Sequence, residues 1–175
     1  DKTGTITEGK FAVTHLELVG DGYDRKQMLE LLSLMEAPSS HPLSATLVRA
    51  AKSEGVSVPT NVTVEQHTIL KGEGVTAQVS GKTVYVGNRR LFERVGMYQN
   101  LGGAYKGLAE QWSEEGGSVG FLGIEGEGII GSFCMSDVIR SEARSAIQSI
   151  RRGGIDVVML TGDGDGAAQT VAKEV

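Results

Sequence analysis

The sequence predicts a mixed α/β chain in which an α+β unit with an antiparallel sheet interrupts a doubly wound α/β domain. Residues 10–134 contain short alternating apolar runs separated by glycine-containing turns, a pattern typical of an antiparallel sheet with helices. From Asp137 onward the pattern changes to helix, continuous apolar run, loop and helix, as at the start of a doubly wound unit. The first residues, DKTGT, carry side chains whose chemistry suits this tail, so the middle is interpreted as an insertion.

The composition is that of an ordinary globular chain. It has 175 residues, 39% of them hydrophobic and 22% charged, with a net charge of -5 and no basic cluster that predicts a nucleic-acid partner. The single cysteine, Cys134, excludes an internal disulfide, indicates a reducing compartment and is expected to be a small buried residue. No apolar run approaches the ~20 residues that cross a bilayer. We therefore expect this piece to be soluble, and we expect it to be monomeric. Because its first residue is an aspartate and not a methionine, we also expect it to be excised from a longer protein.

The first half of the chain has regular patterns in a clear order. Residues 11–19 alternate like a half-buried strand, and Asp24 is expected to cap a helix whose apolar residues recur at helical spacing. The stretch PSSHP ends this helix, and a second helix is expected to stop at Gly55. Two of the next three strands are joined by the turn Ser80-Gly81 as a hairpin. The expected helices cover residues 25–37 and 43–55, and the expected strands cover residues 62–70, 74–80 and 82–87.

The second half continues with helices, a hairpin and the α/β tail. A short helix and a longer one, which glycines stop, precede two strands around a Gly-Glu-Gly turn. An amphipathic helix then leads into IDVVML, a continuous apolar run expected to be a strand buried on both faces, and a loop that becomes a helix follows. The expected helices cover residues 88–96, 103–117 and 141–154, the strands 118–125, 128–135 and 155–160, and the final loop and helix 161–175.

Two short motifs suggest phosphoryl chemistry. An aspartate such as Asp1 can attack a phosphoryl group and form an aspartyl-phosphate, provided that backbone N–H groups of small residues surround the phosphate. Thr3, Gly4 and Thr5 supply such a loop, and Mg²⁺ suits its oxygen ligands. The stretch MLTGD offers a hydroxyl and a backbone amide directly after the apolar run at 155–160, where ligands gather in open parallel sheets. The two motifs are therefore expected to meet.

DKTGT followed far downstream by MLTGD resembles the P-type ATPases, and SSHPLS, KGEGV and VGNRR between them resemble the heavy-metal-transporting branch of that family. The resemblance covers essentially the whole chain, and five ordered motifs make it specific. It implies a haloacid-dehalogenase-like phosphorylation domain interrupted by a nucleotide-binding domain. The implied division is residues 1–9 for the first phosphorylation-domain segment, 10–134 for the nucleotide-binding domain and 135–175 for a truncated second segment.

The resemblance also implies roles at the phosphorylation site. Asp1 would be phosphorylated by ATP, Lys2 would contact the phosphoryl group, and Thr3 would offer its hydroxyl to the phosphate. Asp1 and the Thr3 carbonyl would bind Mg²⁺, with a further ligand outside this piece. The motif after the apolar run would line the same site with Thr161, Gly162 and Asp163. Gly164 stands where the family usually has asparagine. This replacement is expected to have only a small effect on the phosphate loop.

In the nucleotide-binding domain the resemblance places His41, followed by Pro42, against adenine, with Glu36 as the acidic partner. An imidazole can stack on a purine, and a glutamate can accept a hydrogen bond from the adenine amino group. Glycines allow the nucleotide to approach the backbone. The remaining positions that match the family's ATP-binding residues are Gly72, Gly74, Gly87, Asn88 and Arg89.

Several of these residues also have simpler interpretations. Gly72 and Gly74 taken alone fit an ordinary turn, and Asn88 fits a helix cap, which is compatible with a second role. Asp137 matches the aspartate at the family's hinge between the two domains, and a solvated hinge carboxylate is as good an interpretation as a catalytic one. His15 and His67 fall in strand patterns and are expected to be structural. Trp112 is expected in the core.

The implied function is that of the ATP-binding and phosphorylation region of a membrane pump, an enzyme that couples ATP hydrolysis through an aspartyl-phosphate to transport of a heavy-metal cation. SSHP favours zinc or cadmium over copper. The parent would be an integral membrane protein with this piece on the ATP-containing, cytoplasmic side and the ion bound by the membrane part. The piece alone would bind ATP and Mg²⁺ without turnover.

Two other functions remain as alternatives. A soluble phosphatase of the haloacid-dehalogenase type also uses a nucleophilic aspartate, but it generally has a second aspartate two positions later as general acid. Thr3 occupies that position here, which favours a longer-lived phosphoenzyme. A non-catalytic nucleotide-binding module would keep the middle motifs but would not need DKTGT or TGD. The joint pattern favours the pump over both.

Overall fold

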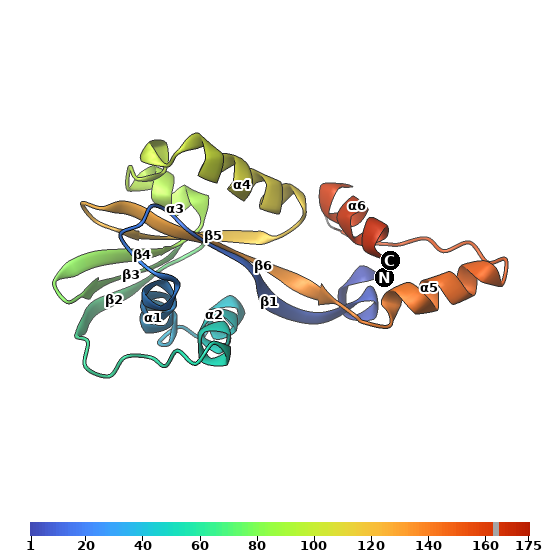
Figure 1. Ribbon diagram of the computed structural model, residues 1–175, viewed down its shortest axis with the longest axis horizontal. Coiled ribbons are helices and arrows are strands. Elements are labelled where there is room, and N and C mark those ends of the chain that lie inside the picture. The colour runs from blue at the N-terminus through green and yellow to red at the C-terminus, as the bar shows by residue number, and fades with distance from the viewer. Residues whose placement is uncertain (163–164) are drawn as a thin grey trace.

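The structure is a computed structural model that describes residues 1–162 and 165–175. Its larger part is an open six-stranded sheet with helices on both faces, and its smaller part consists of two helices and the N-terminal turn (Figure 1). All neighbouring strands are antiparallel, in the order β1-β6-β5-β4-β3-β2. The strands are β1 (Thr7–Leu18), β2 (Val64–Leu70), β3 (Gly74–Val79), β4 (Lys82–Gly87), β5 (Ser118–Ile124) and β6 (Gly128–Ile139). The predicted antiparallel sheet is confirmed.

The α-helices begin close to the positions that the sequence predicts. They are α1 (Arg25–Glu36), α2 (Pro42–Ser53), α3 (Arg89–Arg94), α4 (Gly103–Glu114), α5 (Ala143–Arg152) and α6 (Asp165–Glu174). Asp24 caps α1 in a full capping box with Gln27, and the side chains of His41 and Asn88 cap α2 and α3. A wide helical turn, η1 (Lys2–Ile6), and a short 3-10 helix, η2 (Tyr98–Asn100), were not predicted.

Two apolar clusters cover the two faces of the sheet. One cluster lies under α1 and α2, where Met28 and Leu32 pack on inward-facing residues of the central strands such as Val84. The other lies under α3, η2 and α4, where Phe92 and Tyr98 make edge contacts with the ring of Phe121. Because both faces are covered, the sheet is a rigid platform for the residues at its ends.

The predicted hairpin turn between β3 and β4 is confirmed. Ser80 and Gly81 have φ angles of 50° and 80°, so both lie in the left-handed region that a tight two-residue hairpin requires. The predictions for isolated core residues are also confirmed: Trp112 and Cys134 are buried at 4% and 2% exposure. His15 stacks on Trp112 with ring centroids 4.9 Å apart, and His67 bonds to the Met35 carbonyl, as structural histidines do.

Strands β1 and β6 extend together beyond the sheet as a two-stranded ribbon toward the smaller part (Figure 1). The pairing runs from Leu18–Gly131 to Thr7–Ile139, with irregular register near Lys10 and Thr14. The predicted domain boundaries, after residues 9 and 134, both fall inside these continuous strands. The division into domains therefore remains a prediction.

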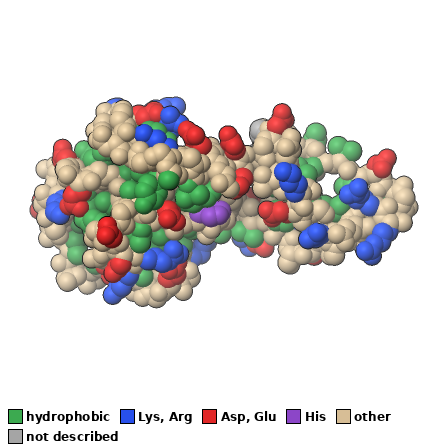
Figure 2. All heavy atoms as spheres, turned by 45° about the horizontal axis from the view of Figure 1, so that its top comes forward, with side chains coloured by type: hydrophobic (Ala, Val, Ile, Leu, Met, Phe, Trp, Pro, Cys, Tyr) green, Lys and Arg blue, Asp and Glu red, His purple; other side chains and the backbone are tan. Residues whose placement is uncertain are grey.

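The predicted strand at residues 155–160 is not formed. This segment is extended between α5 and α6 without strand pairing, and Val158 and Leu160 are 84% and 75% exposed. Figure 2 shows apolar side chains on the surface of the end of the molecule that holds α5 and α6. A buried strand needs neighbours on both edges and covered faces. Within the part of the chain that the structure describes, the backbone of this segment bonds to the end of α5, from Ile155 N–H to the Ile150 carbonyl, and to the N-terminal turn, from Lys2 N–H to the Leu160 carbonyl. Among the described residues, no helix is both long and apolar enough to cross a membrane.

Candidate functional site

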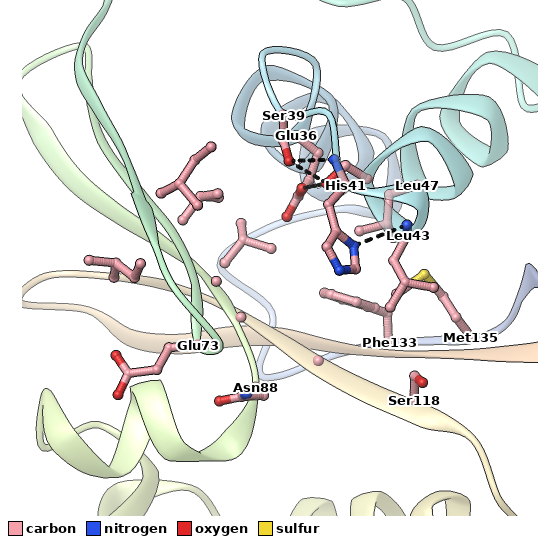
Figure 3. A pocket seen from close by; sticks show the side chains of 18 of the residues that line it. Glu36, Ser39, His41, Leu43, Leu47, Glu73, Asn88, Ser118, Phe133 and Met135 are labelled. Atoms are coloured by element: carbon pink, nitrogen blue, oxygen red, sulfur yellow. Dashed lines mark hydrogen bonds between the residues drawn. The ribbon is translucent and has the colours of Figure 1, made fainter.

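A pocket of about 440 Å³ opens between α2 and the sheet, and it is lined by residues of β2, β3, β4, β5 and β6 (Figure 3). Six of the predicted ATP-binding residues line it: Glu36, His41, Gly72, Gly74, Gly87 and Asn88. They come from α1, the start of α2, the β2–β3 turn and the end of β4. Segments that are far apart in the sequence thus meet in one concave site.

Glu36, the last residue of α1, is 8% exposed and faces this pocket. Burial raises the pKa of its carboxyl above the ordinary value of 4.5, because the charged form loses water. A hydrogen bond from the Ser44 hydroxyl and the nearby His41 and His67 oppose this shift. The carboxylate is therefore a desolvated acceptor next to a cavity that can hold a ligand.

His41 immediately precedes α2, and its ring points into the pocket (Figure 3). Its Nδ1 accepts the backbone N–H of Leu43 at 3.2 Å, which caps the helix and fixes the ring. Because Nδ1 accepts this bond, the neutral ring carries its proton on Nε2. Pro42 then begins α2, where a missing N–H costs nothing. The HP pair thus aims an imidazole face into the cavity.

The glycines form the opposite wall by close backbone packing. A Cβ at Gly74 would overlap the carbonyl oxygen of Val86, and a Cβ at Gly87 would overlap that of Glu73. Gly72 has a φ of 75° and open space around it. Asn88 donates from Nδ2 to the Gly72 carbonyl at 2.9 Å while its Oδ1 caps α3. Asn88 is therefore both a helix cap and a tie between the two glycine turns.

Arg89 is a predicted binding residue that does not line the pocket. Its guanidinium pairs with Glu93 at 2.6 Å, approaches Glu110 at 3.6 Å and lies over the ring of Tyr98. These contacts direct the side chain to the α3–α4 side of the molecule. Its ATP-binding role stays a prediction that this arrangement does not support.

The sequence reasoning missed several lining residues. Phe133 and Met135 of β6 supply an apolar floor, and Ser39 and Ser44 supply hydroxyls beside Glu36 (Figure 3). Alternation along β6 predicts that Phe133 and Met135 share one face, but not that this face meets the HP turn. The two serines lie on either side of the HP pair in the sequence. A buried glutamate needs hydrogen-bond donors, and nearby serine hydroxyls are the sequence signal for them.

The predicted phosphorylation loop lies at the far end of the β1–β6 ribbon, near both ends of the chain (Figure 1). Asp1 and Thr3 are exposed, and Gly4 adopts a φ of 79° that closes the turn. Arg140 ties the turn to β6, since its backbone N–H bonds to the Ile6 carbonyl and its Nη2 donates to the Gly4 carbonyl at 3.2 Å. The loop thus presents the Asp1 carboxylate to solvent on a braced turn.

The predicted meeting of the two polar motifs is seen in one backbone bond: Lys2 N–H donates to the Leu160 carbonyl at 3.1 Å, next to Thr161. Thr161 is half-buried and Gly162 is exposed. Asp163 and Gly164 lie outside the described residues, so their predicted roles have no structural description. Asp1 and the Thr3 carbonyl are hard oxygen donors of the kind Mg²⁺ prefers. The described residues contain no group of three or more acidic, histidine or cysteine side chains placed to hold a metal.

Asp137, the predicted hinge residue, lies on β6 within the ribbon. Its Oδ2 accepts the Thr7 hydroxyl at 2.6 Å and its Oδ1 accepts the Lys10 backbone N–H at 2.9 Å. Thr7 is almost fully buried and also accepts the Gly4 N–H at 3.3 Å. A carboxylate on one strand therefore links the other strand to the N-terminal turn that holds the predicted phosphorylation loop.

Comparison with known proteins is consistent with this geometry. The family description haloacid dehalogenase-like hydrolase matches residues 1–175. The chain is 35% identical to the cadmium/zinc-transporting ATPase HMA2 of Oryza sativa subsp. japonica and 33% identical to the copper-exporting P-type ATPase of Bacillus subtilis (strain 168). These alignments cover 96% and 99% of this chain but 15% and 21% of the relatives, so the chain spans less than a quarter of their length.

Solved structures show the same similarity. A zinc-transporting PIB-type ATPase in the E2.Pi state superimposes with a TM-score of 0.83 at 30% identity, over 99% of this chain and 27% of that one. The catalytic domain of the CPx-ATPase CopB-B, described for its changes upon nucleotide binding, gives 0.68 at 26% identity, over 99% and 56%. From the match over its full length, the chain belongs to the haloacid dehalogenase-like hydrolases.

Proposed function

We propose that this chain is the ATP-binding and phosphorylation region of a heavy-metal-transporting P-type ATPase. The observation that carries the proposal is the joint placement of two sites: the pocket around Glu36 and His41, and the exposed Asp1 at the end of a ribbon that joins both parts. The division into a nucleotide-binding domain, residues 10–134, and two phosphorylation segments is part of the proposal.

The pocket suits a nucleobase better than a phosphate chain. Its charged lining residues are Glu36 and Glu73, and the Arg94 guanidinium lowers the pKa of Glu73, so that carboxyl stays ionised. Phe133 offers an aromatic floor opposite the His41 ring. An adenine between them would place its amino group near Glu36, and its negatively charged phosphates would extend outside the acidic lining toward solvent.

In the proposed chemistry, a carboxylate oxygen of Asp1 attacks the γ-phosphorus of ATP, the bond to the β,γ-bridging oxygen breaks, and ADP leaves. Bound Mg²⁺ would neutralise charge on the phosphates, and Asp1 and the Thr3 carbonyl are the residues that would hold it. Lys2 and Thr161 adjoin this carboxylate along the chain and across the backbone bond to Leu160. Arg140 braces the turn through its bond to the Gly4 carbonyl.

The identity of the transported cation rests on the relatives, whose names include cadmium, zinc and copper. SSHP keeps zinc or cadmium ahead of copper in this proposal. The cation would be bound by a membrane part of the parent protein, with the present chain on the cytoplasmic side. Phosphorylation of Asp1 would bias that part between ion-accessible states.

The test of the nucleotide site is calorimetric titration of the chain with ATP and GTP. His41→Ala should weaken ATP binding by about 1 kcal/mol or more, the size of a lost ring-stacking contact. Lys52→Ala, at the other end of the same helix, is the matched control and should bind like wild type. Unchanged binding in His41→Ala, or no ATP binding in wild type, contradicts the proposal. Hydrolysis of a phosphate ester that Asp1→Asn abolishes would then favour a phosphatase.

A further inference from the structure

Behind the pocket, a chain of hydrogen bonds leads from the HP turn to Glu36. The His41 backbone N–H donates to Ser39 Oγ at 3.2 Å, the two serine hydroxyls are 2.9 Å apart, and Ser44 donates to Glu36 Oε2. Each hydroxyl has one hydrogen, so Ser44, which gives its own to Glu36, accepts from Ser39. All the bonds therefore point in the same direction, toward the carboxylate.

This chain fixes one oxygen of Glu36 and leaves the other for a ligand. Ser44 is 4% exposed and sits in the first turn of α2, so its hydroxyl has little freedom to leave Oε2. Among the described residues, no hydrogen bond reaches Oε1, although the carboxylate lines the pocket. This oxygen can therefore accept a hydrogen bond from a donor group of a ligand in the pocket.

We propose that Ser44 is a positioning residue that orients the ionised carboxylate of Glu36 toward the nucleobase and so determines the preference for adenine over guanine. Adenine presents an amino donor at the edge where guanine presents a carbonyl acceptor. An ionised Glu36 can only accept hydrogen bonds, so it favours the amino group, whereas a protonated Glu36 can donate to the carbonyl. This inference rests on the proposed nucleotide site.

The protonation of Glu36 depends on the groups that face it. Burial favours the neutral form, while Ser44 from α2, His41 from the turn before it and His67 from β2 favour the ionised form. Ser44 is the one of these three that bonds directly to the carboxylate. Removing its hydroxyl should therefore raise the pKa of Glu36 and make the neutral form available at higher pH.

The experiment compares wild type, Ser44→Ala and the control Ser53→Ala, which removes an exposed hydroxyl from the other end of α2. Ligand-free NMR titration of the Glu36 carboxyl carbon measures its midpoint, and calorimetry measures ATP and GTP affinity across pH. We expect a higher midpoint in Ser44→Ala and an ATP-to-GTP affinity ratio reduced by about threefold to tenfold at neutral pH. Ser44→Thr, which keeps the hydroxyl, should restore the ratio, and Ser53→Ala should match wild type.

Two results would overturn the inference. If Ser44→Ala leaves both the midpoint and the affinity ratio unchanged, Ser44 does not position Glu36. If the titration midpoint of Glu36 moves but the ATP-to-GTP affinity ratio does not, Ser44 affects the pKa of the carboxyl without selecting the base. Failure of wild type to bind either nucleotide is a different outcome, because it contradicts the proposed function while the ligand-free titration still reports whether Ser44 acts on Glu36.

Discussion

Asp137 and Thr7 lie on opposite strands of the β1–β6 ribbon and are joined by a hydrogen bond of 2.6 Å between the Thr7 hydroxyl and Oδ2. The other carboxylate oxygen accepts the Lys10 N–H, at a place where the strand register is irregular and ordinary ladder bonds are interrupted. One side chain thus substitutes for the missing backbone pairing at the point where the larger part of the molecule meets the smaller one.

Replacing Asp137 should loosen this junction. In Asp137→Ala the Lys10 amide loses its acceptor, and bonds to charged groups are worth about 1.5–3 kcal/mol, so that amide should exchange with deuterium faster by roughly tenfold or more. Asp137→Asn keeps one carbonyl acceptor and should show a smaller change. Hydrogen exchange followed by NMR measures both, with amides of β4 as internal reference. Equal protection at Lys10 in all three proteins would contradict the account.

Gly166 of α6 packs directly on the end of α4, where a Cβ would overlap the Glu114 carbonyl oxygen. Alanine is a better helix former than glycine by about 1 kcal/mol, so Gly166→Ala should stabilise an isolated α6 and destabilise this docked one. Gly107→Ala on α4, where nothing lies within 4 Å of the added Cβ, provides the control and should raise the melting temperature. A rise in both variants would show that α6 does not dock on α4 in solution.

Gly74 should be intolerant of any side chain because both its φ of 151° and the adjacent Val86 carbonyl oppose a Cβ. Gly74→Ala is expected to reduce the free energy of unfolding by about 2–4 kcal/mol, as strain in a packed backbone does. Gly72→Ala, with open space but a left-handed φ, should cost only about 1–2 kcal/mol. Chemical denaturation measures the two. Similar losses would show that the close approach of β3 and β4 does not govern the Gly74 position.

The buried carboxyl of Glu36 should make stability depend on pH in a defined direction. Its folded pKa is raised above the ordinary 4.5, so the folded state binds this proton more tightly, and stability falls as pH rises from the unfolded to the folded pKa. Glu36→Gln removes the charge and should therefore be more stable than wild type at neutral pH. The difference should vanish once the pH drops below the ordinary value. Urea titrations at several pH values test this, and a gain that persists at low pH would contradict it.

The same variant should bind ATP less well than wild type. An amide can place its NH₂ group where the carboxylate accepts from the adenine amino group, which leaves a mismatched pair in the pocket. Glu36→Gln would then gain stability and lose affinity together, the trade-off common at sites where charge is buried for function. If Glu36→Gln is more stable than wild type but binds ATP with unchanged affinity, Glu36 does not contact the base.

The sequence predicts the local elements well because their signals are local. The box formed by Asp24 and Gln27, the left-handed turn at Ser80-Gly81 and the alternation along β6 each depend on a few neighbouring residues. The apolar run at residues 155–160 shows the limit of this reasoning. Hydrophobicity predicts a buried strand there, but a strand forms only where partners pair with it, and pairing is a property of the whole fold.

The pocket follows the same rule. The short motifs of the sequence predict Glu36, His41, Asn88 and three glycines as binding residues, and all of these line the cavity. Arg89 does not line it, and the side chain of Pro42 lies outside what the structure describes. Phe133 could not be placed there, since it arrives from a strand more than ninety positions later in the chain. Arg89 is next to Asn88 in sequence, yet a helix turns successive side chains to different directions, and its carboxylate partners lie on the other side.

The ribbon of β1 and β6 has a mechanical consequence. Its last pair, Thr7–Ile139, lies at the end that carries both η1 and α5, so a load that separates these two elements acts on the hydrogen bonds one after another, as in unzipping. The Thr7–Asp137 bond is among the first in line. A load that bends the ribbon out of its plane is instead shared by both strands along their length. Separation of the two elements therefore begins at the rung beside Asp137, whereas both strands carry a bending load together.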